Sequence, residues 1–484
     1  MGGRQSAPDQ ADSQPLDKDD MESLGRPNAP LAEKEAAFRR VRAHLCKSLT
    51  LEERQNAVRS VQERNKDAAL WAVTSEQSSS LSLDRVADRV RGLLFGAALA
   101  DATGLSTEFL SRQAVQEFYG DNYPFSPQCG GRVKPDLHRA MWAPGDWTDD
   151  TDQLILILQS LFASGGRADE QDFARRLVAW KERGFPELGD ASGAGLGAQT
   201  KAVLQRENFC AEPAAVARER WASAGKGTAA ANGGVMRTAI TGVAWFWDGA
   251  AVEANTLAFC RTTHPDPRCL ASCVAVASCV SALLRGDDAQ GIEKVVEGAL
   301  ARAVGVLRAE AAAACDVWPA SHDGDSTPAS PAGAEADLRA HWALSEGESV
   351  AGLRLDDTSS GIGYTFKCLG AALWALRHCQ TGPGVDGEAE FTRVVRAIVR
   401  EGGDADTNAC VAGAVVGCRL GFSQLPAGWV AELPHASWLE AHAQKLLGLL
   451  GLRRAHARTR PAEGPASGAP SGGAGAEESE GRVP

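Results

Sequence analysis

Apolar residues recur at helical spacing along almost the whole chain. Ala-rich segments with a period of about 3.6 residues alternate with short loops of Gly, Pro and Asp. Stretches in which apolar and polar residues alternate, as in a half-buried strand, are nearly absent. The pattern therefore predicts an all-α protein whose functional groups lie on loops and at helix starts.

The same pattern divides the 484 residues into segments. Residues 1–30 and 460–484 have the polar, Pro-containing compositions that predict disorder. Residues 31–80 predict one or two amphipathic helices, as an accessory extension, and then a polar linker. The main body is expected to span residues 83–452, with a disordered insertion at about 320–338.

One apolar helix of the body follows a run of oxygen-bearing side chains. Thr148, Asp149 and Asp150 stand directly before the apolar run Leu154–Leu161. Thr and Asp at this position commonly cap the free N–H groups of a helix and suit its positive end. Capping alone would explain this segment.

A second segment of the same composition changes that interpretation. Asp404, Asp406 and Thr407 lie between a Gly pair and another apolar helix. Two such helix starts suggest two halves of one site, because Mg²⁺, Mn²⁺ and Ca²⁺ prefer oxygen ligands. The carboxylates could neutralise two divalent ions. An EF-hand is a poor alternative, since neither segment has its twelve-residue loop with Gly at position six and Glu at position twelve.

Several loops carry weaker candidates, each with a plainer structural explanation. Glu108 follows a Gly-containing break and, from that segment alone, is best explained as a surface residue. The loop with Gly193, Gly195 and Gly197 could offer N–H groups to a phosphate, but a flexible turn has the same composition. A predicted strand does not precede it, so a Rossmann fingerprint is rejected. Asn232 is a candidate polar contact.

Two basic side chains stand in similar loops. Arg237 is either an anion partner or an arginine satisfied by its neighbours. His264, beside a proline, is more often a structural hydrogen-bonding residue than a catalyst.

Composition narrows the class of protein. The formal net charge is −12 and Lys and Arg form no stripe, which argues against nucleic-acid binding. The polar start argues against a secretory signal, and the apolar runs are too short or too charged for a membrane span. The twelve scattered Cys residues fit buried thiols in a reducing compartment. We therefore expect a cytoplasmic protein.

One feature of the N-terminus bears on membranes. Met1 to Ser6 fits the N-myristoylation pattern, with Gly2 as the acceptor. A chance match explains it equally well, because the following Asp residues supply no basic second signal for a stable anchor.

Six motifs, taken together and in order, carry a resemblance to a known family. They are GLLFGAALADATGLSTE, GDWTDDT, NGGVMR, TTHPDP, GYTFKCLGAALWAL and GGDADT. From about Leu83 to Leu452 the chain resembles the ADP-ribosylglycohydrolase family, which includes the dinitrogenase reductase-activating glycohydrolases. The resemblance implies an orthogonal multi-helix bundle with a binuclear Mg²⁺ or Mn²⁺ centre. It also implies hydrolysis of the bond between ADP-ribose and a protein or small-molecule acceptor, by water attack at the ribose anomeric carbon.

The resemblance also assigns roles to residues. It implies Glu108 as the catalytic acid or base. The implied metal ligands are Thr148, Asp149, Asp150, Asp404, Asp406 and Thr407. The implied substrate-binding positions are Gly193, Gly195, Asn232, Gly233, Gly234, His264, Ser360, Gly361 and Tyr364.

Departures from the family pattern leave the substrate open. Ala231 stands where the family usually has Gly, and the pair Asp152–Gln153 is more acidic than expected and does not end in Met. One alternative is a hydrolase of another ribosyl compound on the same metals. Another is a non-catalytic ADP-ribose-binding or crystallin-like relative. The third is an all-α protein whose acidic segments are only helix caps.

Overall fold

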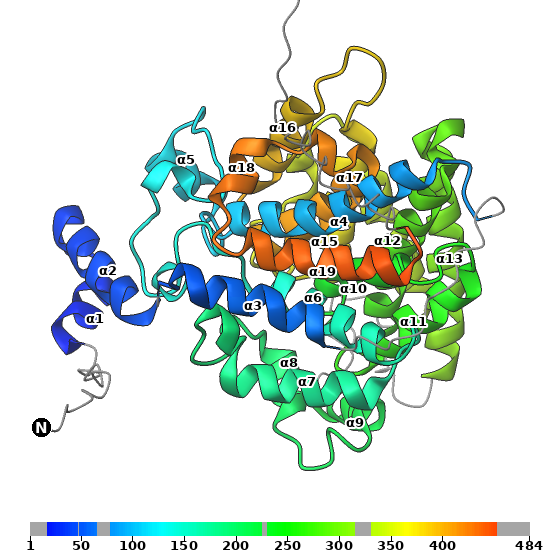
Figure 1. Ribbon diagram of the computed structural model, residues 1–484, viewed down its shortest axis with the longest axis horizontal. Helices are drawn as coiled ribbons and strands as arrows, with labels where there is room; N and C mark the ends of the chain where they lie inside the picture. Colours follow the sequence, from blue (N-terminus) through cyan, green and yellow to red (C-terminus); the bar gives the residue numbers. More distant parts are fainter. Residues whose placement is uncertain (1–16, 47, 65–77, 225–229, 315–330, 453–484) are drawn as a thin grey trace, which may run out of the picture.

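The computed structural model describes residues 17–46, 48–64, 78–224, 230–314 and 331–452. These residues form a bundle of α-helices joined by loops and short 3₁₀ turns (Figure 1). Within them, the β-structure amounts to one isolated bridge between Ala231 and Tyr364. The prediction of an all-α fold is confirmed.

The α-helices are numbered in chain order. They are α1 Lys18–Gly25, α2 Leu31–Leu45, α3 Leu51–Glu63, α4 Leu83–Gly104, α5 Arg112–Tyr119, α6 Asp149–Ala163, α7 Glu170–Arg183, α8 Ala198–Leu204, α9 Pro213–Ala224, α10 Val235–Thr238, α11 Gly249–Arg261, α12 Pro267–Arg285, α13 Ile292–Ala313, α14 Pro331–Leu344, α15 Thr365–His378, α16 Gly387–Val399, α17 Ala405–Leu420, α18 Ala427–Glu432 and α19 Ala436–Leu449. The 3₁₀ turns are η1 Cys129–Gly131, η2 Arg139–Met141, η3 Pro186–Leu188, η4 Ala239–Gly242, η5 Asp287–Gln290, η6 Val350–Leu353 and η7 Phe422–Gln424.

Helices α4 and α17 form the centre of the body and lie against each other along their length. Glycine makes this close approach possible. A Cβ at Gly92 or Gly96 of α4 would collide with the carbonyl oxygens of Gly417 and Gly413 of α17. The contact sets the end of α4 beside the start of α17, because a Cβ at Gly104 would overlap the backbone of Asp406. Two segments far apart in sequence therefore meet at one point.

The apolar helix α12 lies inside the bundle. Its length and composition would allow it to cross a membrane, but 94% of its apolar window is buried by the rest of the protein. Helices α11, α13 and α15 cover it, and Cys269 and Cys273 are fully buried in its face. Burial of this kind is typical of a core helix.

The predicted N-terminal disorder is wrong for part of residues 1–30. Lys18–Gly25 form helix α1, which the side chain of Asp17 caps. Asp20 accepts hydrogen bonds from Arg40 of α2, and Leu24 is buried. This contact with α2 stabilises a segment whose composition alone predicted disorder. Residues 1–16, with Gly2, lie outside the described part of the chain.

The accessory helices expected in residues 31–80 are α2 and α3, and Ser79 and Ser80 fix the end of the linker. Their hydroxyls donate to the carbonyls of Leu284 and Arg285. The predicted insertion at 320–338 is partly wrong, because its end belongs to α14, where Leu338 is buried. Packing against α13 and α15 stabilises that Ala-rich segment. The tail at 460–484 lies outside the described residues.

Candidate functional site

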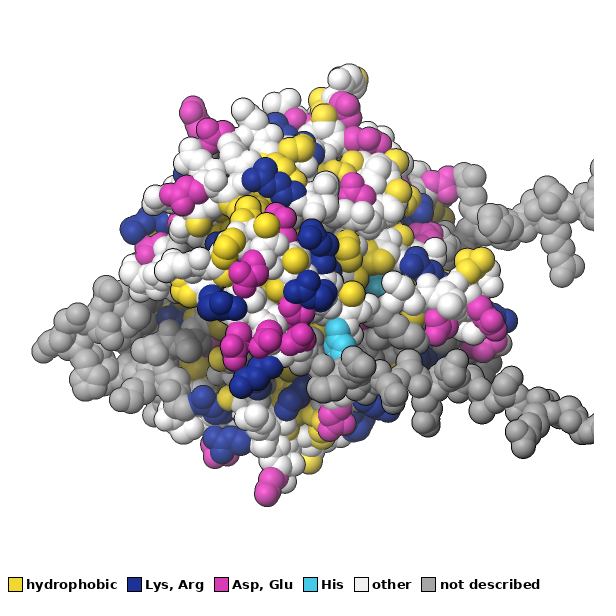
Figure 2. All heavy atoms as spheres, turned by 90° about the vertical axis from the view of Figure 1, so that its left-hand side faces the viewer, with side chains coloured by type: hydrophobic (Ala, Val, Ile, Leu, Met, Phe, Trp, Pro, Cys, Tyr) yellow, Lys and Arg dark blue, Asp and Glu magenta, His cyan; other side chains and the backbone are white. Residues whose placement is uncertain are grey.

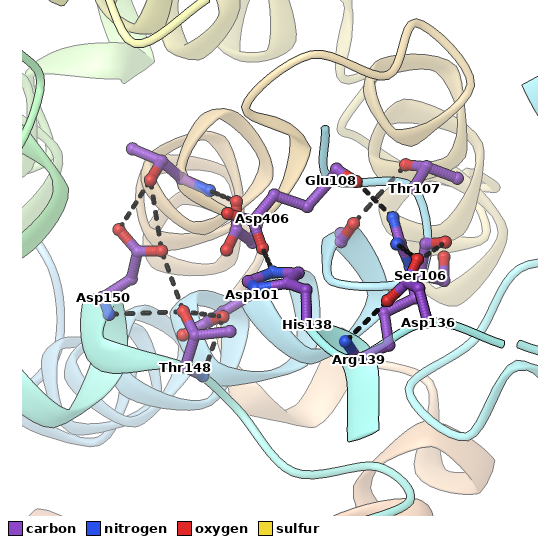
Figure 3. Close-up of polar contacts among 12 residues, drawn as sticks. Asp101, Ser106, Thr107, Glu108, Asp136, His138, Arg139, Thr148, Asp150 and Asp406 are labelled. Carbon is purple, nitrogen blue, oxygen red and sulfur yellow. Dashed lines mark hydrogen bonds and ion pairs between the residues drawn. The ribbon is translucent and has the colours of Figure 1, made fainter. Parts of the chain in front are cut away.

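The site lies where the end of α4 meets the starts of α6 and α17 (Figure 3). Asp149 and Asp150 occupy the first turn of α6, and Thr148 is its N-cap. Asp404 is the N-cap of α17, and Asp406 follows in its first turn. The two acidic segments, more than 250 residues apart, are joined directly because the Thr407 hydroxyl donates to the Asp150 carboxylate at 2.9 Å. The sequence-based expectation that the two segments come together is therefore fulfilled.

Asp101, in the last turn of α4, is a member of the site to which the sequence analysis gave no role. It is fully buried, and its carboxylate accepts hydrogen bonds from the backbone N–H and hydroxyl of both Thr148 and Thr151, at 2.6–3.1 Å. Burial raises the pKa of Asp101 to about 7, and the four hydrogen bonds act against that rise. Its position seven residues before Glu108, at the end of the same apolar helix, was the available signal.

Carboxylate oxygens gather in two adjacent clusters. Asp101, Asp150 and Asp406 each offer an oxygen within 4.8 Å of the others, and so do Glu108, Asp404 and Asp406. Asp406 belongs to both clusters. This sharing places two possible cation positions side by side.

The electrostatics of the clusters favour positive counterions. Burial is the largest cause that raises the pKa values of Asp149, Asp150, Asp404 and Asp406, and neighbouring carboxylates raise them further. Buried like charges are unfavourable unless a cation compensates them. The donors are all oxygen, which suits hard divalent ions. The residues present therefore fit a Mg²⁺ or Mn²⁺ centre.

Asp149 lies beside these clusters and is held by neighbours. Its carboxylate accepts a hydrogen bond from Gln153 Nε2 at 2.7 Å. A Cβ at Gly195 would overlap the same carboxylate, so the Gly-rich loop passes directly over it. Gln153 in turn accepts from Arg237 Nη1 at 2.6 Å. The terminal nitrogens of Arg237 are thus bonded locally, Nη1 to Gln153 and Nη2 to the Thr263 hydroxyl at 2.6 Å.

The unusual pair Asp152–Gln153 has a structural explanation. Gln153 links Arg237 to Asp149. Asp152 accepts from the indole N–H groups of Trp147 and Trp180, at 2.8 and 3.0 Å. Hydrogen bonds to both side chains of the pair therefore hold the start of α6 in place.

Glu108 occupies the turn that follows α4, and its backbone is tied to the second acidic segment. The N–H of Phe109 donates to the Gly403 carbonyl and the N–H of Gly403 donates to the Leu110 carbonyl, both at 2.7 Å. Phe109 has a positive φ of 59°, which is uncommon for a large residue and frequent at functional sites. Glu108 is buried and within reach of both Asp404 and Asp406.

His138 is a second residue that the sequence analysis missed. Its Nε2 pairs with the Glu108 carboxylate (Figure 3), and its ring packs 4.8 Å from that of Phe109. The neighbouring Arg139 side chain donates to the carbonyls of Ser106, at 3.0 Å, and of Glu108. Its place in the loop just before the acidic segment at Thr148 marked it as a candidate site residue. The distance of 30 residues along the chain gave no reason to pair it with Glu108.

The predicted substrate loops reach the site in part. Asn232 Nδ2 donates to Asp404 at 2.9 Å, and the Asn232 N–H pairs with the Gly363 carbonyl at 2.9 Å. Gly233 packs on His264, where a Cβ would lie 2.8 Å from the imidazole Cε1. Burial lowers the pKa of His264 to about 3, which makes it a neutral hydrogen-bonding group beside Thr263.

Other predicted positions lie elsewhere. Gly193 packs on the Trp180 ring and Gly234 packs on Cys260. Ser360 and Gly361 are exposed in the loop before α15. The Tyr364 hydroxyl donates to Asp337 of α14. Their roles in substrate binding stay predictions.

Fold and site together describe an all-α protein with a carboxylate centre that could hold metal ions, and comparison with known proteins gives the family. The ADP-ribosylglycohydrolase family profile matches residues 82–456. The chain therefore belongs to the ADP-ribosylglycohydrolase family and is an enzyme of the glycosyl hydrolase type.

Curated relatives agree with this assignment. The ADP-ribosylarginine hydrolase Tri1 of Pseudomonas putida is 24% identical over 76% of this chain and 81% of its own length. The ADP-ribosyl-[dinitrogen reductase] glycohydrolase of Rhodospirillum rubrum is also 24% identical, over 76% of this chain and 98% of its own. A solved structure titled ADP-ribosylglycohydrolase-related protein complex is 24% identical, with a TM-score of 0.46 over 76% of this chain and 99% of that one.

Proposed function

We propose that the protein is a divalent-metal-dependent hydrolase that releases ADP-ribose from a modified side chain. The observation that carries this proposal is the pair of carboxylate clusters that share Asp406, with Glu108 in one of them. The names of the relatives make ADP-ribosylarginine the first substrate to test. Mg²⁺ or Mn²⁺ is the cation that such an oxygen donor set would hold.

The residues divide the chemistry between them. Asp101, Asp150, Asp404, Asp406 and Glu108 would hold two cations, with Asp149, Thr148 and Thr407 beside them. Such ions, when bound, fix ribose hydroxyls and polarise a water. Positive charge develops at the anomeric carbon as the glycosidic bond breaks, and the concentration of carboxylates suits that charge.

Glu108 carries the proton transfer in this scheme. The water oxygen bonds to the anomeric carbon and loses a proton, while the leaving acceptor takes the bond's electron pair and gains a proton. Glu108 is placed to accept the first proton or to supply the second, and His138 holds its carboxylate in one orientation. The loops at Gly195 and Asn232 lie directly against Asp149 and Asp404, so they form walls for the ribose and diphosphate.

Replacement of Glu108 tests this scheme. Glu108→Gln should lower turnover of ADP-ribosylarginine by roughly 10²–10⁴, the usual contribution of acid–base catalysis. Binding of free ADP-ribose should be largely retained. A matched control is Glu440→Gln, which removes a carboxylate that pairs with Arg91 and belongs to neither cluster and should leave turnover unchanged. Turnover of Glu108→Gln within about tenfold of wild type would contradict the assigned role.

A panel of substrates separates this function from the alternatives. Release of ADP-ribose from arginine, serine or a small-molecule ester identifies the acceptor. Hydrolysis of other ribosyl compounds alone would indicate a different substrate on the same centre. Tight ADP-ribose binding with no turnover of any of these would indicate a non-catalytic reader.

A further inference from the structure

The N-terminal helices α1 and α2 contact the body beside the site, although they precede the segment that the family profile matches. They stand at the edge of the bundle in Figure 1. Figure 2 shows the face on that side of the molecule. Basic and acidic side chains are intermixed on it, and neither charge forms a large continuous patch. Their contact with the body is made at η2, Arg139–Met141, directly after His138.

The contact has an apolar part. Leu24 of α1 and Ala37, Phe38 and Val41 of α2 form a small buried cluster with Ala140 of η2. This cluster is separate from the main core of the bundle. Val41 and Ala140 are almost completely buried. The extension therefore supplies the apolar surface against which the Ala140 side chain of η2 packs.

The contact also has a polar part. Arg42 Nη2 of α2 donates to the Arg139 carbonyl at 2.9 Å. The Cys46 thiol, just after α2, lies 3.9 Å from the Ala140 carbonyl and 3.7 Å from that of Met141. Three successive backbone carbonyls of one short turn therefore face the extension.

The same turn holds Glu108 from its other side. The His138 ring pairs with the Glu108 carboxylate, and the Arg139 guanidinium donates to the Glu108 carbonyl. Both the side chain and the backbone of Glu108 thus rest on residues 138 and 139 (Figure 3). The extension reaches Glu108 through a single layer of intervening residues.

The turn is held by the Arg139 side chain, which bonds to Ser106, Asp136 and Glu108, and by the extension on its other face. It is a single 3₁₀ turn in a long loop, and a cavity of about 1070 Å³, lined by Arg39, Leu137, Trp142 and Asp146 among others, lies between the extension and the body. The position of such a turn depends strongly on each contact that it does make.

We propose that helices α1 and α2 are a positioning element for Glu108, and that they act through His138 and Arg139. The extension fixes η2, and η2 fixes the orientation of the Glu108 carboxylate toward the carboxylate clusters. His138 is a positioning residue in this arrangement. The kinetic test of this proposal rests on the proposed function, whereas a second test, by hydrogen–deuterium exchange, does not.

A double-mutant cycle in the full-length protein gives the kinetic test. The double variant Phe38→Ala/Arg42→Ala should lower kcat roughly tenfold, since displacement of a catalytic group by about 1 Å can reduce rates by up to about 10²-fold. KM should change by less than about threefold. In a His138→Ala background the same double change should have a clearly smaller effect, because coupled contacts are not additive and only the route through Arg139 remains. Equal effects in the two backgrounds would overturn the proposal.

A matched control lies on the same helix. Arg39 is exposed on α2, one turn from Arg42, and Arg39→Ala should leave kcat unchanged. A loss of kcat in Arg39→Ala equal to that in Arg42→Ala alone would show a general effect of charge, and would also overturn the proposal.

Hydrogen–deuterium exchange gives the test that does not need turnover. In Phe38→Ala/Arg42→Ala, exchange should rise in peptides that cover residues 136–142 and 106–109, and should stay at the wild-type rate in helix α13. Unchanged exchange at 106–109, or a uniform rise that includes α13, would overturn the proposal. If the wild type releases ADP-ribose from no substrate, the proposed function fails, and the exchange result alone decides the role of the extension.

Discussion

The two acidic helix starts look alike in sequence but are held in different ways. In the α6 half, the Thr148 side chain caps the helix through the Asp150 N–H and also bonds to Asp101. In the α17 half, Asp404 occupies the N-cap position, yet within the described residues its side chain makes no capping hydrogen bond. Its carboxylate accepts instead from Asn232 of a distant loop. Capping thus explains part of the first half and fails for the second.

The halves differ again in their carboxylates. The α6 half gives Asp150 to one cluster and rests on an additional buried acid, Asp101. The α17 half gives Asp406 to both clusters. At the start of α17 the carboxylates face other carboxylates and do not cap the helix. This arrangement indicates a metal site more strongly than an acidic sequence at a helix start does.

The largest expected difference is in metal stoichiometry. Asp406→Asn removes a member of both clusters and should abolish tight Mn²⁺ binding, together with turnover. Asp150→Asn removes a member of one cluster and should leave one ion bound by Glu108, Asp404 and Asp406. Calorimetric titration with Mn²⁺ measures the number of ions. If the two variants bound the same number of Mn²⁺ ions, the proposed difference between the two halves would be contradicted.

A smaller effect is expected from the amide side chains that orient each half. Gln153→Met removes the donor to Asp149, and Asn232→Leu removes the donor to Asp404. Each should weaken Mn²⁺ binding by about 10–100-fold, the usual effect of losing a partner of a metal ligand. Gln424→Met, at an exposed position in η7, is a control that should bind Mn²⁺ as the wild type does. Wild-type affinity in Gln153→Met would show that the amide does not orient Asp149.

Asp101 of α4, the acid on which the α6 half rests, should make metal-free stability depend on pH. The folded pKa of Asp101 is raised to about 7, above an ordinary value of about 4, so the folded state binds more protons between these values. The free energy of unfolding of metal-free protein should therefore fall as pH rises from about 4 to about 7. Urea unfolding in EDTA at pH 5 and 8 measures this fall. Saturating Mg²⁺ should reduce it, and Asp101→Asn should reduce it without metal. An unchanged pH profile in Asp101→Asn would contradict the role given to burial.

The smallest effect concerns capping. Thr148→Val removes the side-chain cap of α6 and should lower the free energy of unfolding by about 1 kcal/mol in EDTA. Asp404→Asn removes no cap of α17 and should not lower it, because a half-buried carboxylate among other carboxylates is unfavourable without metal. Thermal unfolding of both variants checks this. A greater loss in Asp404→Asn than in Thr148→Val would mean that Asp404 has a structural role.

Hydrophobic period and local composition were sufficient to predict the all-α class and the junction of the two acidic segments. Asp101 was missed because its role depends on how α4 packs on α17, which glycines at 92, 96 and 104 permit. His138 was missed because its partner, Glu108, lies 30 residues away in the chain. Local composition also gave disorder for residues 18–25 and 331–338, which tertiary contacts turn into helix. The spacing of apolar residues and the local composition indicate only local structural preference. The residues and segments that were missed depend on contacts between parts of the chain that are far apart in sequence.

The most direct test of the account is calorimetry of ADP-ribose binding in Mg²⁺, in Mn²⁺ and in EDTA. Wild type and the double variant Asp149→Ala/Asp404→Ala, which changes one residue in each half, are compared. If the two acidic helix starts form one metal-dependent site, the wild type binds ADP-ribose with Mg²⁺ or Mn²⁺, binds it far more weakly in EDTA, and the variant does not bind. Absence of metal binding and of ADP-ribose binding in the wild type would contradict the account and leave the acidic segments as helix starts only.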